Sequence, residues 1–455
     1  MAIADVLRDG MAVWPVVIPL AAAAFTALAR GRPIVRRTAM EVAVATTLLA
    51  SLLLFARVAR GEVVVMAFGG WGAPVGITFV ADLLGAALCA AAGIVGAAVA
   101  TFARADIRDR RRRAGFDPLF LGMLAAVNGA FLTGDLFNLY VWFELMLVTA
   151  VGLLTLDRRP AQVDGALRYA ALSMMGATFM LVGIGLVYGE TGTLDLATLG
   201  GILAGRAPSF ALVTAGYLLL AGMLLKAGVF PLFFWLPASY HTAPISVAAA
   251  LAGLLTKVAF YAVLRVMVVV FGVGSASAAV PGIPALLALL AALTILASVL
   301  AAIAQTDVRR LLAFHVMGQV AYLVMGLALA TSLGAAAAIF YTVHTMLVQT
   351  GLFLGAGAIA RAGRGYDLRV VGGLIREHPV FSALFAVLAL SISGIPPMSG
   401  FWAKALVIDA AFRSGVPWAG WLAAAALLTG FLTMYSLSTV WTRAFWRPRP
   451  RGVSV

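Results

Sequence analysis

The chain has only three lysines, and all three lie inside long apolar stretches: Lys226, Lys257 and Lys404. A charge at the centre of a bilayer costs about 3 kcal/mol or more, so such residues persist when they pair, face water or carry ions. A desolvated lysine can release its proton, whereas an arginine stays charged. These residues therefore predict proton transport, with a snorkelling side chain or a structural ion pair as the alternative.

An acid and two histidines complete the set of buried titratable residues. Glu144, in the run Leu139-Tyr-Val-Trp-Phe-Glu144, is expected to pair with Lys226, because opposite charges lower each other's cost of burial. His315 and His344 could relay protons near neutral pH, and a hydrogen-bonded core histidine is the alternative for each. The predicted proton-translocation residues are Glu144, Lys226, Lys257, His315, His344 and Lys404.

Proline interrupts two of the apolar stretches close to a lysine. The run Lys226-Ala-Gly228-Val-Phe-Pro231 places the lysine before a break, and Ser393-Gly394-Ile-Pro396-Pro397 places a break before Lys404. Proline removes a backbone donor, and the freed carbonyls need protein or water partners in a membrane. Two such spans, five apart, predict a repeated transporter architecture, with simple kinks as the alternative. The helix-break residues are Pro231, Gly394, Pro396 and Pro397.

The composition indicates the elements that must hold these residues. Of 455 residues, 63% are apolar and 11% charged, and the mean hydropathy is +1.04. Soluble domains are about half apolar and about a quarter charged. A soluble fold of this length could not bury so much apolar surface, so a soluble enzyme, a fibrous protein and a disordered chain are excluded.

Runs of about 18 or more apolar residues predict an all-α polytopic membrane protein with thirteen spans. Spans 7 and 12 are the broken ones. Spans 4–8 and 9–13 are expected to form two inverted five-helix repeats, because an odd offset makes the second unit enter from the opposite face. The approximate limits are 11–29, 39–56, 77–102, 116–133, 136–156, 169–189, 210–235, 245–272, 283–304, 311–331, 335–360, 379–410 and 417–441.

The spans group into four parts along the chain. Residues 1–110 hold the first three helices, 111–275 the first repeat, 276–445 the second repeat, and 446–455 a basic tail. Twenty-three arginines follow odd-numbered spans and five lie in the opposite loops. Because positive loops stay in the cytoplasm, we expect a cytoplasmic-membrane protein with an external N-terminus and cytoplasmic basic loops and tail. We interpret the basic runs as orientation signals rather than nucleic-acid or lipid-specific sites.

The sequence predicts neither a cofactor nor a metal. The single cysteine, Cys89, excludes a disulfide framework and an iron–sulfur ligand set. The four histidines are scattered and form no metal-binding pattern. The net charge of +14 does not indicate a nucleic-acid partner, because arginines that set the orientation of the chain in the membrane account for it.

Several motifs together resemble a known superfamily. The segments are Leu132-Thr-Gly-Asp-Leu-Phe-Asn-Leu-Tyr-Val-Trp-Phe-Glu144-Leu-Met-Leu, Lys226-Ala-Gly-Val-Phe-Pro-Leu-Phe-Phe-Trp-Leu-Pro237, Leu255-Thr-Lys-Val258, Arg310-Leu-Leu-Ala-Phe-His-Val-Met-Gly-Gln-Val-Ala-Tyr322 and Gly394-Ile-Pro-Pro-Met-Ser-Gly-Phe-Trp-Ala-Lys404. Their order and spacing are similar to those of antiporter-like membrane subunits, which include the proton-pumping subunits of respiratory complex I. Among these, the chain most resembles the D-type subunit of Mrp-type multisubunit cation/proton antiporters.

This resemblance implies a fourteen-helix fold in which Glu144 and Lys226 are the coupling pair. Lys257 would be the central relay and Lys404 the terminal proton carrier, while His315 and His344 match polar positions of the second half. Two departures stand out. Gln349 occupies a position near which family members often have a lysine, and the final family helix would follow the thirteenth span.

The expected function is that of a secondary-transporter subunit, not an enzyme. It would exchange Na⁺ for H⁺ in the bilayer as part of a complex with other subunits. The first alternative is a proton-pumping membrane-arm subunit of a complex I-like or hydrogenase-like redox complex. The second is a scaffold subunit whose buried charges only contribute to packing.

Overall fold

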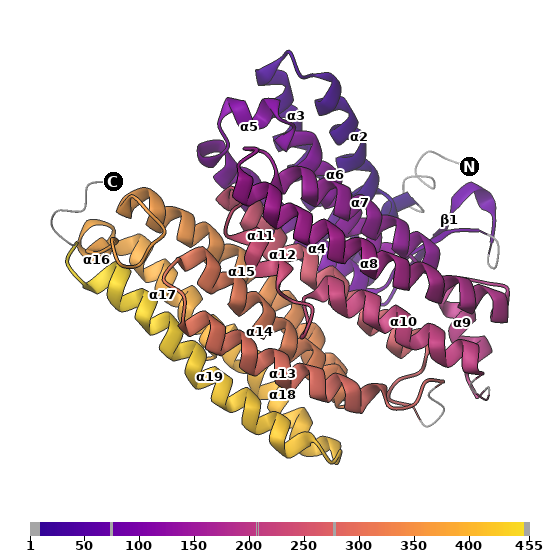
Figure 1. Cartoon of the computed structure of the whole chain (residues 1–455). Coiled ribbons are helices and arrows are strands. Elements are labelled where there is room, and N and C mark those ends of the chain that lie inside the picture. The colour runs from indigo at the N-terminus through magenta and orange to yellow at the C-terminus, as the bar shows by residue number, and fades with distance from the viewer. Residues whose placement is uncertain (1–9, 73–75, 206, 208, 276–278, 450–455) are drawn as a thin grey trace. The chain divides into compact units, whose positions relative to one another are not determined.

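The computed structural model describes residues 10–449 apart from 73–75, 206, 208 and 276–278. The chain is a succession of apolar helices with one short β-hairpin (Figure 1). It divides into two compact units, one of Met1–Ala227 with Leu254–Pro281 and one of Gly228–Gly253 with Gly282–Val455. The fold is thus mainly helical, as the apolar runs predict.

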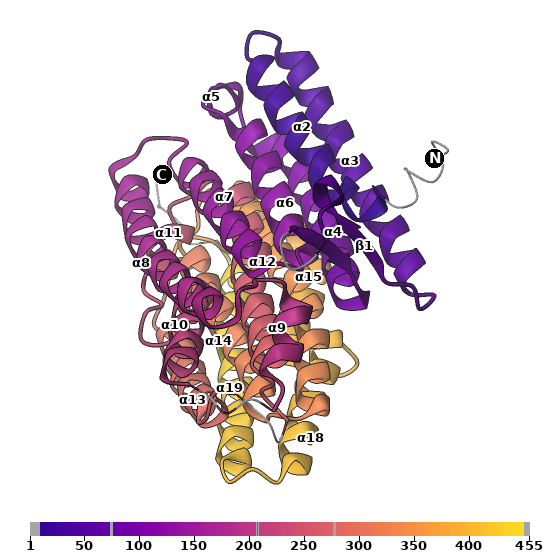
Figure 2. The same cartoon turned by 90° about the vertical axis from the view of Figure 1, so that its right-hand side faces the viewer.

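The first unit holds the N-terminal helices. Helix α2 packs against α3 and α6, and α3 packs against α4, and Figure 2 shows α2 and α3 running side by side. Helix α8 packs along α10. The helices are η1 (Gly10–Ala12), α2 (Trp14–Leu28), α3 (Pro33–Val58), η2 (Phe68–Gly70), α4 (Leu83–Asp106), α5 (Asp109–Arg113), α6 (Phe116–Leu132), α7 (Leu136–Leu154), α8 (Pro160–Thr191), α9 (Leu196–Leu203) and α10 (Phe210–Ala227).

The unit boundary falls inside helix α12 (Ile245–Leu264), whose end continues as a π-helical turn, η3 (Arg265–Val270). In the second unit α14 packs against α13 and α15, while α17, α18 and α19 contact one another. Its helices are α11 (Trp235–Tyr240), α13 (Ile283–Ile303), α14 (Val308–Ala328), α15 (Ser332–Gly363), α16 (Leu374–Glu377), α17 (Pro379–Ser393), α18 (Ser399–Ser414), α19 (Ala419–Trp441) and η4 (Thr442–Trp446).

Each of the thirteen predicted spans corresponds to an apolar helix. Within the described residues, ten helices are long and apolar enough to cross a membrane, and α2, α6 and α17 are shorter apolar helices. Helix α14 is buried along its length apart from Arg309 and Arg310. A helix that is apolar and buried on every side forms the interior of a membrane bundle.

The third predicted span differs from the structure at its start. It was expected to begin at residue 77, but Thr78–Ala81 form strand β2, which pairs antiparallel with β1 (Val64–Ala67). Helix α4 begins only after Asp82, whose carboxylate accepts a hydrogen bond from the Gly85 amide at 2.8 Å. An apolar run without a helix cap can be strand or helix, and here the cap residue decides the boundary.

Spans 7 and 12, which the sequence predicts to be broken, are interrupted at the expected places. Helix α10 ends at Ala227, and Gly228 follows with a φ of 76°. Helix α17 ends at Ser393, and Gly394 follows with a φ of 88°. These left-handed conformations suit glycine. Pro231 lies between α10 and α11, and Pro396-Pro397 lies between α17 and α18. The Phe230–Pro231 and Pro396–Pro397 peptide bonds are cis.

Two isolated bridges show the same backbone pattern in the two units. Asp135 pairs antiparallel with Asp195, and Asp307 pairs antiparallel with Asp367. In each pair the first aspartate caps a helix: Asp135 accepts from the Asn138 amide of α7, and Asp307 accepts from amides at the start of α14. The helices that lead to the second aspartates, α8 and α15, have 32 residues each.

Candidate functional site

Glu144 and Lys226 meet within the first unit. Lys226 lies in the last turn of α10, and its Nζ is 3.9 Å from Oε1 of Glu144 on α7. The lysine is 7% exposed and the glutamate 34%. The ring of Phe143 lies beneath the ammonium, with its centroid 5.3 Å away. The pairing expected from the sequence is therefore present, as a loose contact rather than a tight hydrogen bond.

Lys257 lies on α12 and is fully buried. The order of the predicted relay between Lys257 and Lys226 stays a prediction. Arg265, the first residue of η3, has a structural role: its Nε donates to the Tyr261 hydroxyl at 2.9 Å, and it pairs with Asp82.

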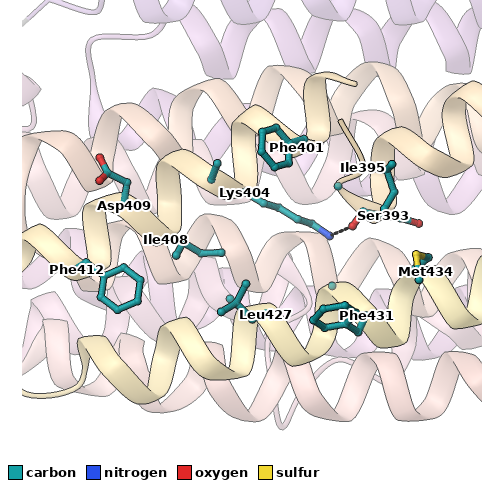
Figure 3. A pocket seen from close by; sticks show the side chains of 14 residues that line it. Ser393, Ile395, Phe401, Lys404, Ile408, Asp409, Phe412, Leu427, Phe431 and Met434 are labelled. Atoms are coloured by element: carbon teal, nitrogen blue, oxygen red, sulfur yellow. Dashed lines mark hydrogen bonds between the residues drawn. The ribbon is translucent and has the colours of Figure 1, made fainter. Parts of the chain in front are cut away.

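Lys404 occupies a buried position beside the break between α17 and α18. Its Nζ donates to the Ser393 carbonyl at 3.1 Å and lies 4.9 Å from the ring centroid of Tyr322. Figure 3 shows the side chain reaching along α18 toward Ser393. A Cβ on Gly394 would come within 2.8 Å of the lysine Cδ, so only glycine leaves room for this path.

The Lys404 side chain forms part of the wall of a cavity of about 460 Å³ between α18 and α19. Apart from the lysine and Asp409 its named walls are mostly apolar, including Phe412 and Phe431 (Figure 3). The ammonium is therefore held by one backbone carbonyl and one aromatic face, both uncharged. Neutral partners leave a lysine free to exist in either protonation state, in contrast to a tight carboxylate pair.

His315 lies on α14 and is 2% exposed. Its Nε2 is 3.0 Å from the Ser436 hydroxyl of α19, and its backbone carbonyl accepts a hydrogen bond of 3.5 Å from Gln349. The glutamine that replaces the expected family lysine thus contacts the backbone of a relay candidate. The sequence does not single out Ser436, because a serine in an apolar helix carries no local signal.

His344 on α15 reaches the start of α18. Its Nδ1 is 3.0 Å from the Ser399 hydroxyl, which lies 3.2 Å from that of Ser391. The Tyr341 ring stacks on the imidazole at a centroid distance of 5.5 Å, and its hydroxyl donates to Gln319. Since Tyr341 also contacts the ring of Tyr322, which faces Lys404, two aromatic rings lie between His344 and Lys404.

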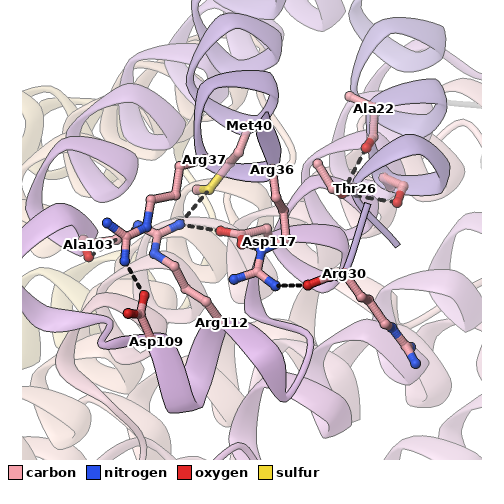
Figure 4. Close-up of polar contacts among 11 residues, drawn as sticks. Ala22, Thr26, Arg30, Arg36, Arg37, Met40, Ala103, Asp109, Arg112 and Asp117 are labelled. Carbon is pink, nitrogen blue, oxygen red and sulfur yellow. Dashed lines mark hydrogen bonds and ion pairs between the residues drawn. The ribbon is translucent and has the colours of Figure 1, made fainter. Parts of the chain in front are cut away.

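A further charged cluster was not expected from the sequence. Arg36 and Arg112 belong to the basic runs that follow the first and third predicted spans, and they are only 1% and 4% exposed and both contact Asp117. Figure 4 shows the two guanidinium groups on different sides of this carboxylate. Arg112 also approaches the sulfur of Met40 at 3.7 Å. The orientation signal is thus carried partly by buried, structural arginines.

Metal chemistry has no site among the described residues, since they contain no cluster of three His, Cys, Asp or Glu side chains. Cys89 is fully buried in α4. The second unit instead places two titratable side chains beside hydroxyl groups, His315 beside Ser436 and His344 beside Ser399.

Comparison with known proteins gives the family of the chain. Residues 133–433 match the family model described as NADH:quinone oxidoreductase/Mrp antiporter, transmembrane, and this range contains all six proton-translocation candidates. The chain therefore belongs to this family of multi-pass membrane proteins.

Individual relatives give the degree of similarity. The chain is 37% identical to the D-type subunit of the Na⁺/H⁺ antiporter of Alkalihalophilus pseudofirmus, over 96% of this chain and 87% of the relative. It superposes on a chain of the Mrp complex from Dietzia sp. DQ12-45-1b with a TM-score of 0.88 and 32% identity, covering 98% and 81% of the two chains. A chain of respiratory complex I from Thermus thermophilus matches with a TM-score of 0.75 and 26% identity, covering 96% and 91%.

Proposed function

We propose that the chain is the proton-translocating subunit of a multisubunit Na⁺/H⁺ antiporter. The observation that carries this proposal is the Glu144–Lys226 pair, a half-buried acid and a buried base held at 3.9 Å on two helices rather than locked in a short salt bridge. Similarity to the D-type antiporter subunit supports the same assignment. The chain would act as a secondary-transporter subunit and not as an enzyme.

In this proposal Glu144 controls the charge state of Lys226. When the carboxylate approaches, the ammonium form is favoured, and when it withdraws, burial favours release of the proton. Lys257 would carry the proton onward, and His315, His344 and Lys404 would conduct it through the second unit. Two polar contacts support this last step: Ser399 lies beside His344, and Gln319 accepts a hydrogen bond from Tyr341.

The architecture proposed is two inverted repeats, residues 111–275 and 276–445, preceded by the helices of 1–110 and followed by the basic tail 446–455. The matched aspartate bridges and the two glycine–proline breaks support it. We further propose a cell-membrane location with the N-terminus outside and the basic loops and tail in the cytoplasm. Residues 450–455 of the tail lie outside the described part of the chain.

The partners proposed are the other membrane subunits of the antiporter complex, the lipid bilayer, and the transported ions Na⁺ and H⁺. The alternative, a membrane-arm subunit of a redox complex, is supported by the similarity to a complex I chain, which has lower identity. Gene neighbourhood separates the two: genes for NADH- or hydrogenase-like subunits would favour the redox complex.

Reconstituted vesicles test the proposal. Lys226→Ala and Glu144→Ala should abolish Na⁺-dependent proton flux while the complex still assembles, since each removes one half of the pair. Glu144→Asp should keep partial activity because it keeps the charge. Glu377→Ala is the matched control, since this exposed glutamate should be replaceable without loss of flux.

Three results would contradict the assignment. Full flux in both Lys226→Ala and Glu144→Ala would exclude the coupling pair. Wild-type flux in Glu144→Gln would show that the charge is not needed. Unchanged transport after removal of Lys226 and Lys404 together would favour a scaffold subunit.

A further inference from the structure

The second unit contains a cavity of about 230 Å³ that the proton-relay candidates do not account for. It lies where the turn between α13 and α14 meets the C-terminal part of α19. Its polar walls are Gln305, Thr306, Tyr435, Ser436, Thr439 and Arg443. A water molecule occupies about 30 Å³ of liquid and needs two to four polar partners, so this cavity has room and partners for several.

The walls of the cavity differ in exposure. Tyr435 is exposed and Thr439 and Arg443 are partly exposed, whereas Ser436 is 1% exposed. The Ser436 hydroxyl is both a wall of this cavity and the partner of His315 Nε2, at 3.0 Å. A hydroxyl donates one hydrogen bond and accepts others, so it can pass a proton between a water chain and an imidazole.

We propose that this cavity is a water-filled vestibule that gives His315 access to solvent, with the Ser436 hydroxyl as the link between water and imidazole. The vestibule opens at the end of the second unit that holds the α13–α14 turn, which is the cytoplasmic end in the orientation proposed above. The assignment rests on the proposed function for its transport role, but the hydration of the cavity does not.

The first experiment separates the hydroxyl from the shape of residue 436. Ser436→Thr keeps a hydroxyl, whereas Ser436→Val has the same shape as threonine but places a methyl group there and excludes water. We expect flux through the reconstituted complex to stay near wild type with threonine and to fall roughly tenfold with valine, the effect of losing one buried hydrogen bond. Ser438→Val is the matched control, since the hydroxyl of this exposed serine on the same helix donates to the Tyr435 carbonyl. Equal flux in the Thr and Val variants would overturn the proposal.

The second experiment measures water access directly. In a Cys89→Ala background, Thr439→Cys should react with a charged, membrane-impermeant thiol reagent from the cytoplasmic side, and the reaction should block proton flux. Thr433→Cys should stay unreactive, because Thr433 is 1% exposed and does not line the cavity. An unreactive Thr439→Cys, or one that reacts only from the other side, would refute the vestibule.

The two experiments separate failure of the vestibule from failure of the proposed function. If Lys226→Ala abolishes flux but the valine and threonine variants behave alike, the antiporter assignment stands and the vestibule is wrong. If Lys226→Ala keeps full flux, the assignment fails, and the thiol labelling still reports whether the cavity is hydrated.

Discussion

Single residues show two ways in which this protein keeps charge away from water. Arg36 and Arg112 share the carboxylate of Asp117, so fixed charges are neutralised by a fixed partner. Lys226 has only a loose carboxylate at 3.9 Å, and Lys404 has a backbone carbonyl and an aromatic ring. Arginine cannot release its proton and lysine can, so the tight partner belongs to the structural residue and the loose ones to the candidate carriers.

Removal of the shared carboxylate should destabilise the first unit strongly. Asp117→Asn would leave two buried guanidinium groups without an anion, and loss of one partner in a buried charge pair costs about 3–5 kcal/mol. The measurement is the thermal unfolding of the purified complex in detergent. Asp109→Asn is the matched control, because its pair with Arg37 is exposed and should contribute about 1 kcal/mol or less. A similar small shift for both variants would contradict the structural role of Asp117.

Asp157, in the turn between α7 and α8, predicts a specific pH dependence. Hydrogen bonds from Arg111, with Arg110 in addition, lower its pKa from the ordinary 3.8 to about 2. A carboxylate with a lowered pKa contributes its full stabilisation to the folded state when the pH is above its ordinary pKa. This stabilisation is lost as the pH falls through the lowered pKa. The difference in melting temperature between wild type and Asp157→Asn should therefore be constant near neutral pH and shrink below about pH 4. A difference that does not change over this range would exclude the effect.

At the scale of elements, the break between α17 and α18 depends on close approach of two backbones. A Cβ on Gly400, in the first turn of α18, would fall on the Ser391 carbonyl oxygen and lie 3.1 Å from His344 Cε1. The glycine thus allows α18 to approach α17 and brings Ser399 to His344. The absence of a side chain at Gly400 therefore permits both the break between α17 and α18 and the His344–Ser399 contact.

Gly400→Ala should consequently reduce both stability and transport. Overpacking costs about 1–3 kcal/mol, and more where backbone must move, and the displaced α18 would lengthen the His344–Ser399 contact. Thermal unfolding and proton flux measure the two effects. Gly420→Ala, in the first turn of α19 with nothing near its Cβ, is the control and should be neutral or stabilising by about 0.5–1 kcal/mol. Equal behaviour of the two variants would argue against close packing at Gly400.

For the molecule as a whole, the positive-inside rule makes a prediction about the sides of the membrane. In a Cys89→Ala background, Arg108→Cys in the turn before α5 should react with an impermeant thiol reagent from the cytoplasmic side only. Arg60→Cys, in the turn after α3, should react from outside only, and both native side chains are exposed. The reverse pattern in intact cells and inverted vesicles would invert the proposed orientation.

The sequence by itself determined the helices, the breaks and the list of titratable residues. Hydropathy and the restrictions of glycine and proline act within a few residues, so the thirteen spans and the interruptions at Pro231 and Pro396 could be predicted locally. The β-hairpin before α4 was missed, because a short apolar run does not distinguish strand from helix.

Only the tertiary structure decided which of these residues meet. The approach of Glu144 to Lys226, of Ser436 to His315, and of Asp117 to its two arginines depends on how each helix is rotated and shifted against its neighbours. Side-chain packing between helices sets that rotation, and it is not encoded in any single apolar run. The three lysines were thus identified by their types and hydropathy. The partners of Lys226 and Lys404, the hydroxyl beside His315 and the adjoining cavity became visible only in the packed chain.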